Sequence, residues 1–190
     1  MYDLPTTIEI SGAEYSIRND GDYRNVLSAF AVLNDTELTE QERVLCALLI
    51  FYDVDGMDEI MSMPDLEEAT KKMYEFFNAG RPEGKGSNYK LIDWEADSAM
   101  IVSAVNNIAG KEIRAVEYMH WWTFMGYYCS IGESTLSTVV AIRDKILKGK
   151  KLEKWERQFR SENPQYFDWN YKSAEDIEAE EWLKEVWNKE

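Results

Sequence analysis

The feature that most constrains the fold is an uncharged, aromatic run from Tyr118 to Gly132, which contains no Asp, Glu, Lys or Arg. Apolar side chains would occupy nearly every angle around a helix formed from this run, YMHWWTFMGYYCSIG. A helix that is apolar on all sides is buried in a core or against a partner. The sequence therefore predicts a central helix that starts near Ile113, packs closely on a neighbour at Gly126 and ends with Gly132 in a left-handed conformation.

The rest of the chain predicts more helices and a single hairpin. Residues 7–10 and 15–18 alternate with period two around a short turn, which indicates a β-hairpin over 7–18. Capping residues and apolar spacing predict helices that begin near Asp20 or Asp22, the Thr39–Glu42 capping box, Pro64, Asp93, Ser134 and Leu152. We therefore expect a mainly α protein: a compact multi-helix bundle with a short N-terminal β-hairpin and an acidic C-terminal helix.

The length of 190 residues suits one domain. We assign residues 1–172 to a single helical domain and residues 173–190 to the acidic helix, either docked or free. The segment 81–90 (RPEGKGSNYK) is poor in apolar residues and predicts a mobile loop inside the domain.

The charge of the chain is strongly acidic and uneven. The formal net charge is −15, which argues against nucleic-acid binding because phosphate needs cations. Residues 111–160 nevertheless carry 10 bases against 6 acids. The most basic part, 143–151, has three interpretations: a dock for an acidic partner, a solvated helix end, or a surface on which the acidic 175–185 stretch folds back.

Neither a membrane nor an oxidising compartment is expected. The longest uncharged run is shorter than the roughly 20 residues that span a bilayer. Cys46 and Cys129 lie in apolar runs, as buried thiols do. With no charged-then-apolar leader at the N-terminus, we expect a soluble protein of the cytoplasm.

Few residues could support catalysis. Glu117 and His120 have the Glu-x-x-His spacing of carboxylate metal sites, but His120 is the only histidine, so a second such element is missing. The sequence has no nucleophile elbow, phosphate-binding Gly loop or Cys-x-x-Cys pair. We expect no enzyme activity, no metal and no cofactor.

The run HWWTFMGYYCSIGE at 120–133, followed by KGKKLEKWE at 148–156, resembles a family of small proteins from the tail-gene cluster of siphophages and prophages of Gram-positive bacteria. The likeness includes YDLP at 2–5 and DWEAD at 93–97. Such proteins are encoded between the major tail protein and the tape measure protein. The resemblance implies a tail-assembly chaperone of the host cytoplasm that binds the tape measure protein, with homo-oligomerisation left open. The signature residues expected in the core are His120, Trp121, Trp122, Gly132 and Glu133.

A chaperone for a long, apolar, helical client needs exposed rings, and Trp and Tyr are favoured at interfaces. The aromatic residues near the C-terminus are therefore the partner-binding candidates: Trp155, Phe159, Tyr166, Phe167, Trp169, Trp182 and Trp187.

Two other functions stay open. A structural tail component would remain in the virion, whereas a chaperone would leave. An acidic decoy that mimics DNA is the weakest alternative, because 21 bases intervene among the 36 acids.

Overall fold

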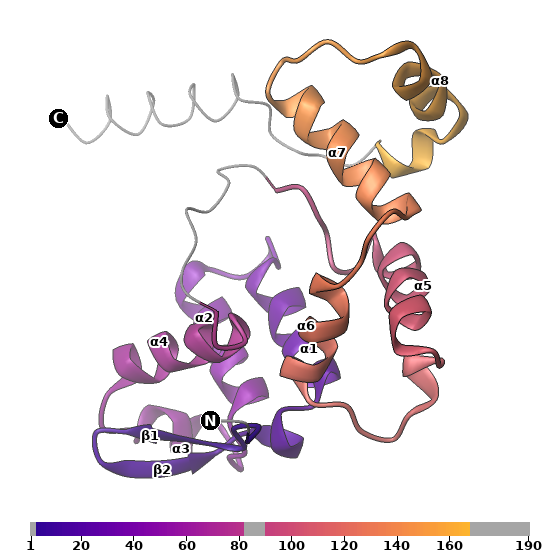
Figure 1. Cartoon of the computed structure of the whole chain (residues 1–190). Helices are drawn as coiled ribbons and strands as arrows, with labels where there is room; N and C mark the ends of the chain where they lie inside the picture. Colours follow the sequence, from indigo (N-terminus) through magenta and orange to yellow (C-terminus); the bar gives the residue numbers. More distant parts are fainter. Residues whose placement is uncertain (1–2, 82–89, 168–190) are drawn as a thin grey trace, which may run out of the picture. The chain divides into compact units, whose positions relative to one another are not determined.

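The computed structural model of the chain describes residues 3–81 and 90–167 (Figure 1). The described residues form helices and one two-stranded sheet, so the predicted mainly α fold with an N-terminal hairpin is confirmed. The chain divides into two compact units, described separately below: residues 1–84 with 105–130, and residues 85–104 with 131–190. The single domain over 1–172 stays a prediction. The loop and acidic helix predicted at 81–90 and 173–190 lie almost entirely outside the described residues.

The first unit begins with a tight antiparallel hairpin. Strands β1 (Thr7–Ile10) and β2 (Ala13–Ser16) pair with Ile8 opposite Tyr15. The turn consists of Ser11 and Gly12 alone, and both have positive φ angles, 50° and 82°. Two positive φ values are what a two-residue turn requires to match the strand twist. The sequence predicted a four-residue turn, with the second strand over residues 15–18. The observed turn has two residues, so the second strand begins two residues earlier, at Ala13.

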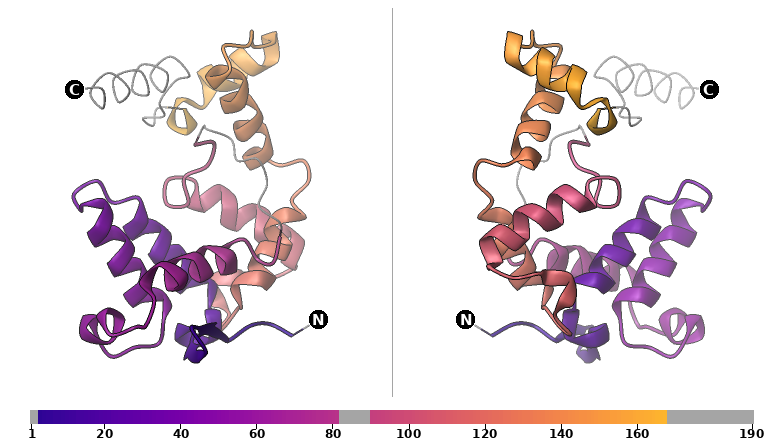
Figure 2. Two further views of the ribbon diagram at one scale, coloured as in Figure 1. Left: turned by 90° about the vertical axis from the view of Figure 1, so that its left-hand side faces the viewer. Right: turned by 90° about the vertical axis from the view of Figure 1, so that its right-hand side faces the viewer.

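Five α-helices of the first unit surround an aromatic core. They are α1 (Tyr23–Leu33), α2 (Glu40–Phe51), α3 (Met57–Met61), α4 (Leu66–Phe77) and α6 (Trp121–Cys129). Helices α1 and α2 lie side by side (Figure 2). As predicted, Asp22 caps α1, and Thr39 and Glu42 form a capping box at the start of α2.

The core of this unit is built from stacked rings. The ring of Phe124 stacks on Tyr23 at 4.9 Å and on Trp121 at 5.4 Å between centroids. Phe30 contacts both Trp121 and Phe77. Trp121 and Phe124 are each only 1% exposed, so the prediction that Trp121 lies in the core is confirmed.

The two adjacent tryptophans of the signature donate hydrogen bonds to carbonyls at the C-terminal end of another helix. The indole N–H of Trp121 donates to the Phe77 carbonyl at 2.9 Å, and that of Trp122 donates to the Phe76 carbonyl at 3.0 Å. Both carbonyls belong to the last turn of α4; the Phe76 carbonyl also accepts from the Ala79 backbone N–H at 2.9 Å, whereas the Phe77 carbonyl has no backbone donor among the described residues. Gly80 follows with φ +69°, and a Cβ there would lie 3.3 Å from the Trp122 ring. The Trp-Trp pair thus binds the C-terminal end of α4, and Trp122 packs on Gly80, which follows that end.

The aromatic helix starts later than the sequence predicted, at Trp121 instead of near Ile113. Residues 113–115 form only a short 3-10 turn, η2 (Ile113–Ala115). His120 has extended backbone angles (φ −59°, ψ 141°), and its Nδ1 accepts the Trp122 backbone N–H at 3.0 Å. His120 is therefore the N-cap of α6, because its ring takes the role that Ser or Asp usually has.

The expectations for two glycines and Glu133 were wrong. Helix α6 ends at Cys129 with Ser130 as its C-cap, so no left-handed residue is needed at Gly132. Gly132 and Glu133 are exposed and do not belong to the core. Gly126 is exposed too, and nothing lies within 4 Å of a Cβ built there, so it marks no close approach.

His120 is fixed from both sides of its ring. It is 1% exposed, and its Nε2 lies 3.0 Å from the Pro5 carbonyl. Since Nδ1 accepts a backbone N–H, the neutral ring with its proton on Nε2 satisfies both contacts. Gly21 (φ +77°) packs beneath it, and a Cβ there would lie 3.1 Å from Nε2 and 2.7 Å from the Phe76 ring. Only glycine fits this position.

The second unit contains α7 (Thr135–Leu147), α8 (Lys154–Glu162), the 3-10 turn η3 (Pro164–Tyr166) and most of α5 (Ser98–Ala109), which crosses the unit boundary. The predicted cap of α7 is confirmed, since Ser134 accepts from the Ser137 N–H. Asp93 does not cap α5 directly: its carboxylate accepts from the N–H groups of Glu95 and Ala96 in the turn before the helix.

The buried state of His120 predicts a pH dependence of stability. Burial lowers the pKa of the His120 ring below its ordinary value of 6.5, although the Pro5 carbonyl opposes this. Between the folded and unfolded pKa values the unfolded chain binds more protons, so stability falls as the pH drops below about 6.5. The variant His120→Asn retains a capping acceptor but does not titrate.

We expect the free energy of unfolding of the wild-type chain to fall more steeply between pH 7 and pH 5 than that of His120→Asn, measured by urea denaturation. The carboxylates with lowered pKa, such as Glu112 (about 2), titrate below this window. Parallel pH profiles for the two proteins would contradict the neutral, buried ring.

Candidate partner-binding surface

The second unit is held together by the buried guanidinium of Arg143 on α7. Its two terminal nitrogens donate to the two carboxylate oxygens of Asp97 at 2.7 and 2.9 Å. It also donates to the backbone carbonyls of Tyr166 and Leu91. Arg143 and Asp97 are 1% and 2% exposed. A charge so buried needs this full set of partners, and in binding them it joins α7 to the 90–97 segment and to η3.

A second ion pair fixes α8 against α7. The Lys145 ammonium donates to Glu156 at 2.6 Å, and Glu156 is 2% exposed. The hydrogen bond from Lys145, with one from the Glu153 backbone N–H, holds the pKa of the Glu156 carboxyl below its usual value. Glu156 also completes the capping box of α8 with Glu153.

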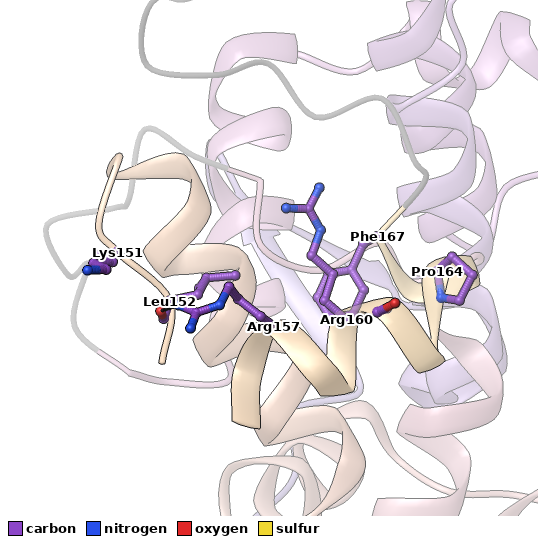
Figure 3. Close-up of a pocket in the computed structure, with 7 residues that line it drawn as sticks. Lys151, Leu152, Arg157, Arg160, Pro164 and Phe167 are labelled. Atoms are coloured by element: carbon purple, nitrogen blue, oxygen red, sulfur yellow. Dashed lines mark hydrogen bonds between the residues drawn. The ribbon is translucent and has the colours of Figure 1, made fainter. Parts of the chain in front are cut away.

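A groove of about 610 Å³ lies along α8 (Figure 3). Leu152, Pro164 and Phe167 supply its apolar surface, while Arg157, Arg160 and Ser161 come from the helix and Lys151 from the segment before it. In Figure 3, Lys151 and Leu152 lie toward one end of the groove and Pro164 toward the other. The lining thus combines apolar side chains with three cationic ones.

Two cations of the groove are unpaired within the described part of the chain. Arg157 donates to the Leu152 carbonyl, but no hydrogen bond or ion pair joins the side chains of Arg160 or Lys151 to another described residue. Several other described Lys and Arg side chains, such as Lys71 and Lys111, also form no ion pair with a described residue, so the groove cations are distinguished by their position beside apolar surface. Cations left free beside apolar surface favour an acidic amphipathic ligand.

The structure separates the aromatic candidates instead of gathering them. Trp155 is 53% exposed, but it does not line the groove, and its indole N–H donates to Glu153. Phe159 and Tyr166 are half-buried. Phe167 is 5% exposed, with its ring edge-to-face to Phe159 at 6.4 Å, so it is not among the exposed members of this set. The other three candidates, Trp169, Trp182 and Trp187, lie outside the described residues.

The basic segment 143–151 is largely used inside the unit. Arg143 and Lys145 pair with Asp97 and Glu156, and Lys148 pairs with Asp144 one helical turn earlier. The predicted dock therefore shifts toward the C-terminus, to Lys151 and the arginines of α8. The fold-back of 175–185 involves residues outside the described part.

The first unit contains a second groove, of about 660 Å³, between the start of α2 and the start of α4. Its apolar wall includes Val44, Leu45 and Leu66, and its rim carries Glu40 and Glu67. Both acids stand in the first turn of a helix, where the dipole already favours them. The helix dipole already accounts for these two acids without a ligand. The α8 groove is therefore the stronger candidate for a partner-binding site.

Within residues 3–81 and 90–167, no group of three His, Cys, Asp or Glu side chains could hold a metal ion. The histidine of the Glu-x-x-His pattern has a structural use, since both ring nitrogens of His120 are occupied by contacts to the backbone. None of the described helices is long and apolar enough to cross a membrane.

A family model described as Bacteriophage Gp15 protein matches residues 1–167. The chain belongs to the bacteriophage Gp15 protein family. The match includes the whole α8 groove and ends at Phe167, which lines it. No curated protein and no solved structure matches the chain.

For this Gp15-family chain, the sequence indicated two groove residues, Phe167 as a binding candidate and Lys151 in the basic segment, but it did not single out Arg157 and Arg160. The Arg143–Asp97 contact joins positions 46 residues apart, and nothing local indicates it. The sequence showed Leu152 and the basic residues of α8. It did not show that the Arg160 side chain forms no hydrogen bond or ion pair with another described residue. Spacing alone could have placed Arg157 and Arg160 on one face, three residues apart.

Removing the Arg143 charge should destabilise the second unit. We expect Arg143→Met to lower the free energy of unfolding by about 3–5 kcal/mol, because it leaves the Asp97 carboxylate buried without its partner. Lys148→Met, on the same helix, removes only an exposed pair and should cost less than about 1 kcal/mol.

Urea denaturation followed by circular dichroism would compare the two variants. Equal transition midpoints would show that the buried pair is not what holds the unit together.

Proposed function

We propose that this protein is a phage tail-assembly chaperone, which binds an amphipathic helical segment of the tape measure protein during tail morphogenesis. It acts by binding alone, without catalysis. The partner segment lies in the α8 groove, with its apolar side on Leu152, Pro164 and Phe167 and its carboxylates near Lys151 and Arg160.

The observation that carries the proposal is the pairing of free cations with apolar surface in the α8 groove. A helix placed in a groove gains affinity from burying one apolar face, and peripheral charges select and orient it. Arg160 provides a guanidinium, which can bind a carboxylate through two parallel hydrogen bonds.

The rest of the molecule suits a soluble carrier of an apolar client. A net charge of −15 keeps a complex with an aggregation-prone segment dispersed. Trp155, 53% exposed and on another side of α8, offers a second anchor, since Trp is enriched among residues that dominate binding energy. The signature residues His120, Trp121 and Trp122 contribute through stability only, because their polar atoms are used inside the first unit.

Membership of a phage protein family supports the biological setting. The same groove would also serve a structural tail component. Mass spectrometry of purified virions separates the two functions: a chaperone is absent from finished particles, and a structural component is present in a fixed copy number.

Two substitutions should weaken binding of the tape measure protein from the same phage. We expect Arg160→Glu to raise Kd at least about tenfold, because it replaces attraction by repulsion, and Trp155→Ala to raise it by a similar factor. Lys111→Glu and Met61→Ala alter an exposed charge and an exposed apolar side chain of the first unit, and should leave Kd unchanged.

Isothermal titration calorimetry with purified proteins measures Kd, and melting curves should confirm that all four variants keep the wild-type Tm. Full-strength binding by the Arg160→Glu, Trp155→Ala double variant would contradict the proposed surface, and absence of binding by the wild-type chain would contradict the function.

A further inference from the structure

We propose that the acidic C-terminal segment of this same chain, residues 168–190, occupies the α8 groove when no partner is bound. The segment lies outside the described residues; its sequence, the place where the described chain ends and the chemistry of the groove support this docking. The docking does not depend on the proposed function; only its role as a competitor does.

The charges of the segment and the groove are complementary. Residues 168–190 carry eight acids and three bases. The groove has Lys151, Arg157 and Arg160 on its lining, and none of these three side chains has a carboxylate partner among the described residues. The acidic segment, which directly follows Phe167, supplies carboxylates that could neutralise them.

The order of residues in the segment also fits. Trp182 and Val186 are four residues apart, as on one face of a helix, and Glu178, Glu181 and Glu185 fall beside them at spacings of three and four. An apolar edge flanked on one side by carboxylates matches a groove whose apolar surface is flanked by arginines.

The connection to the groove is short. Phe167, the last described residue, lines the groove itself. The seven residues 168–174 can span at most about 25 Å, enough to reach any part of a groove whose lining begins at Phe167. A tether of this length gives an effective concentration in the millimolar range, so even a weak interaction would keep the groove filled.

If the groove is also the partner site, a partner must displace the segment. Its apparent affinity would then be lower than its intrinsic affinity by the fraction of chains with an open groove. In the free protein the segment would cover the apolar surface of the groove. A partner that fits the groove better would displace it.

Disulfide trapping in the full-length chain tests the docking without any partner present. Cys46 and Cys129 are replaced by Ser, and the pair Ser161→Cys with Ala179→Cys is introduced, because Ser161 lines the groove and residue 179 lies amid the acids. The matched control pairs Ala179→Cys with Ala141→Cys, an exposed position on α7 of the same unit outside the groove lining.

We expect the intramolecular disulfide at 161–179 to form at least about tenfold faster than that at 141–179 in low salt. Adding Arg157→Glu with Arg160→Glu should reduce the 161–179 rate to the control level. Equal rates for the two pairs, or a rate insensitive to charge reversal, would overturn the proposal. Disulfide-linked dimers in place of the intramolecular product would overturn it too, since the occupant would be a second copy.

Discussion

The buried guanidinium of Arg143 is the interaction on which the second unit depends. A cation removed from water at 1% exposure must be matched by fixed acceptors, and the Asp97 carboxylate with the Tyr166 and Leu91 carbonyls provides them. Because Tyr166 immediately precedes Phe167, the same contacts place the ring that lines the α8 groove. The position of Phe167 in the groove thus depends on the hydrogen bonds that the buried Arg143 guanidinium needs.

The first unit solves a related problem with aromatic side chains. The last carbonyl of helix α4, that of Phe77, accepts from the indole N–H of Trp121, and the indole of Trp122 adds a further donor to the Phe76 carbonyl. His120 caps its own helix and binds the Pro5 carbonyl, 115 residues away in sequence. The most conspicuous residues of the sequence are therefore committed to stability, which leaves recognition to less conspicuous ones on α8.

Local signals in the sequence predicted local structure well. The Thr39–Glu42 capping box, the Asp22 and Ser134 caps and the hairpin all depend on residues within a few positions of each other. The start of α6 could not be predicted, because a histidine cap requires a ring held by distant contacts. The prediction for Gly132 was wrong because a glycine after an apolar run resembles a helix end, whereas α6 already ends at Cys129. The groove could not be predicted either, since it depends on the long-range Arg143–Asp97 pair.

The central claim is that the Gp15-family chain binds its partner through α8 and the residues beside it, while the His-Trp-Trp segment stays internal. Amide hydrogen exchange of the full-length protein, with and without the tape measure protein, tests this most directly. The account predicts slower exchange on binding within residues 151–167 and unchanged exchange within residues 120–129. Slower exchange confined to 120–129, with 151–167 unaffected, would contradict it.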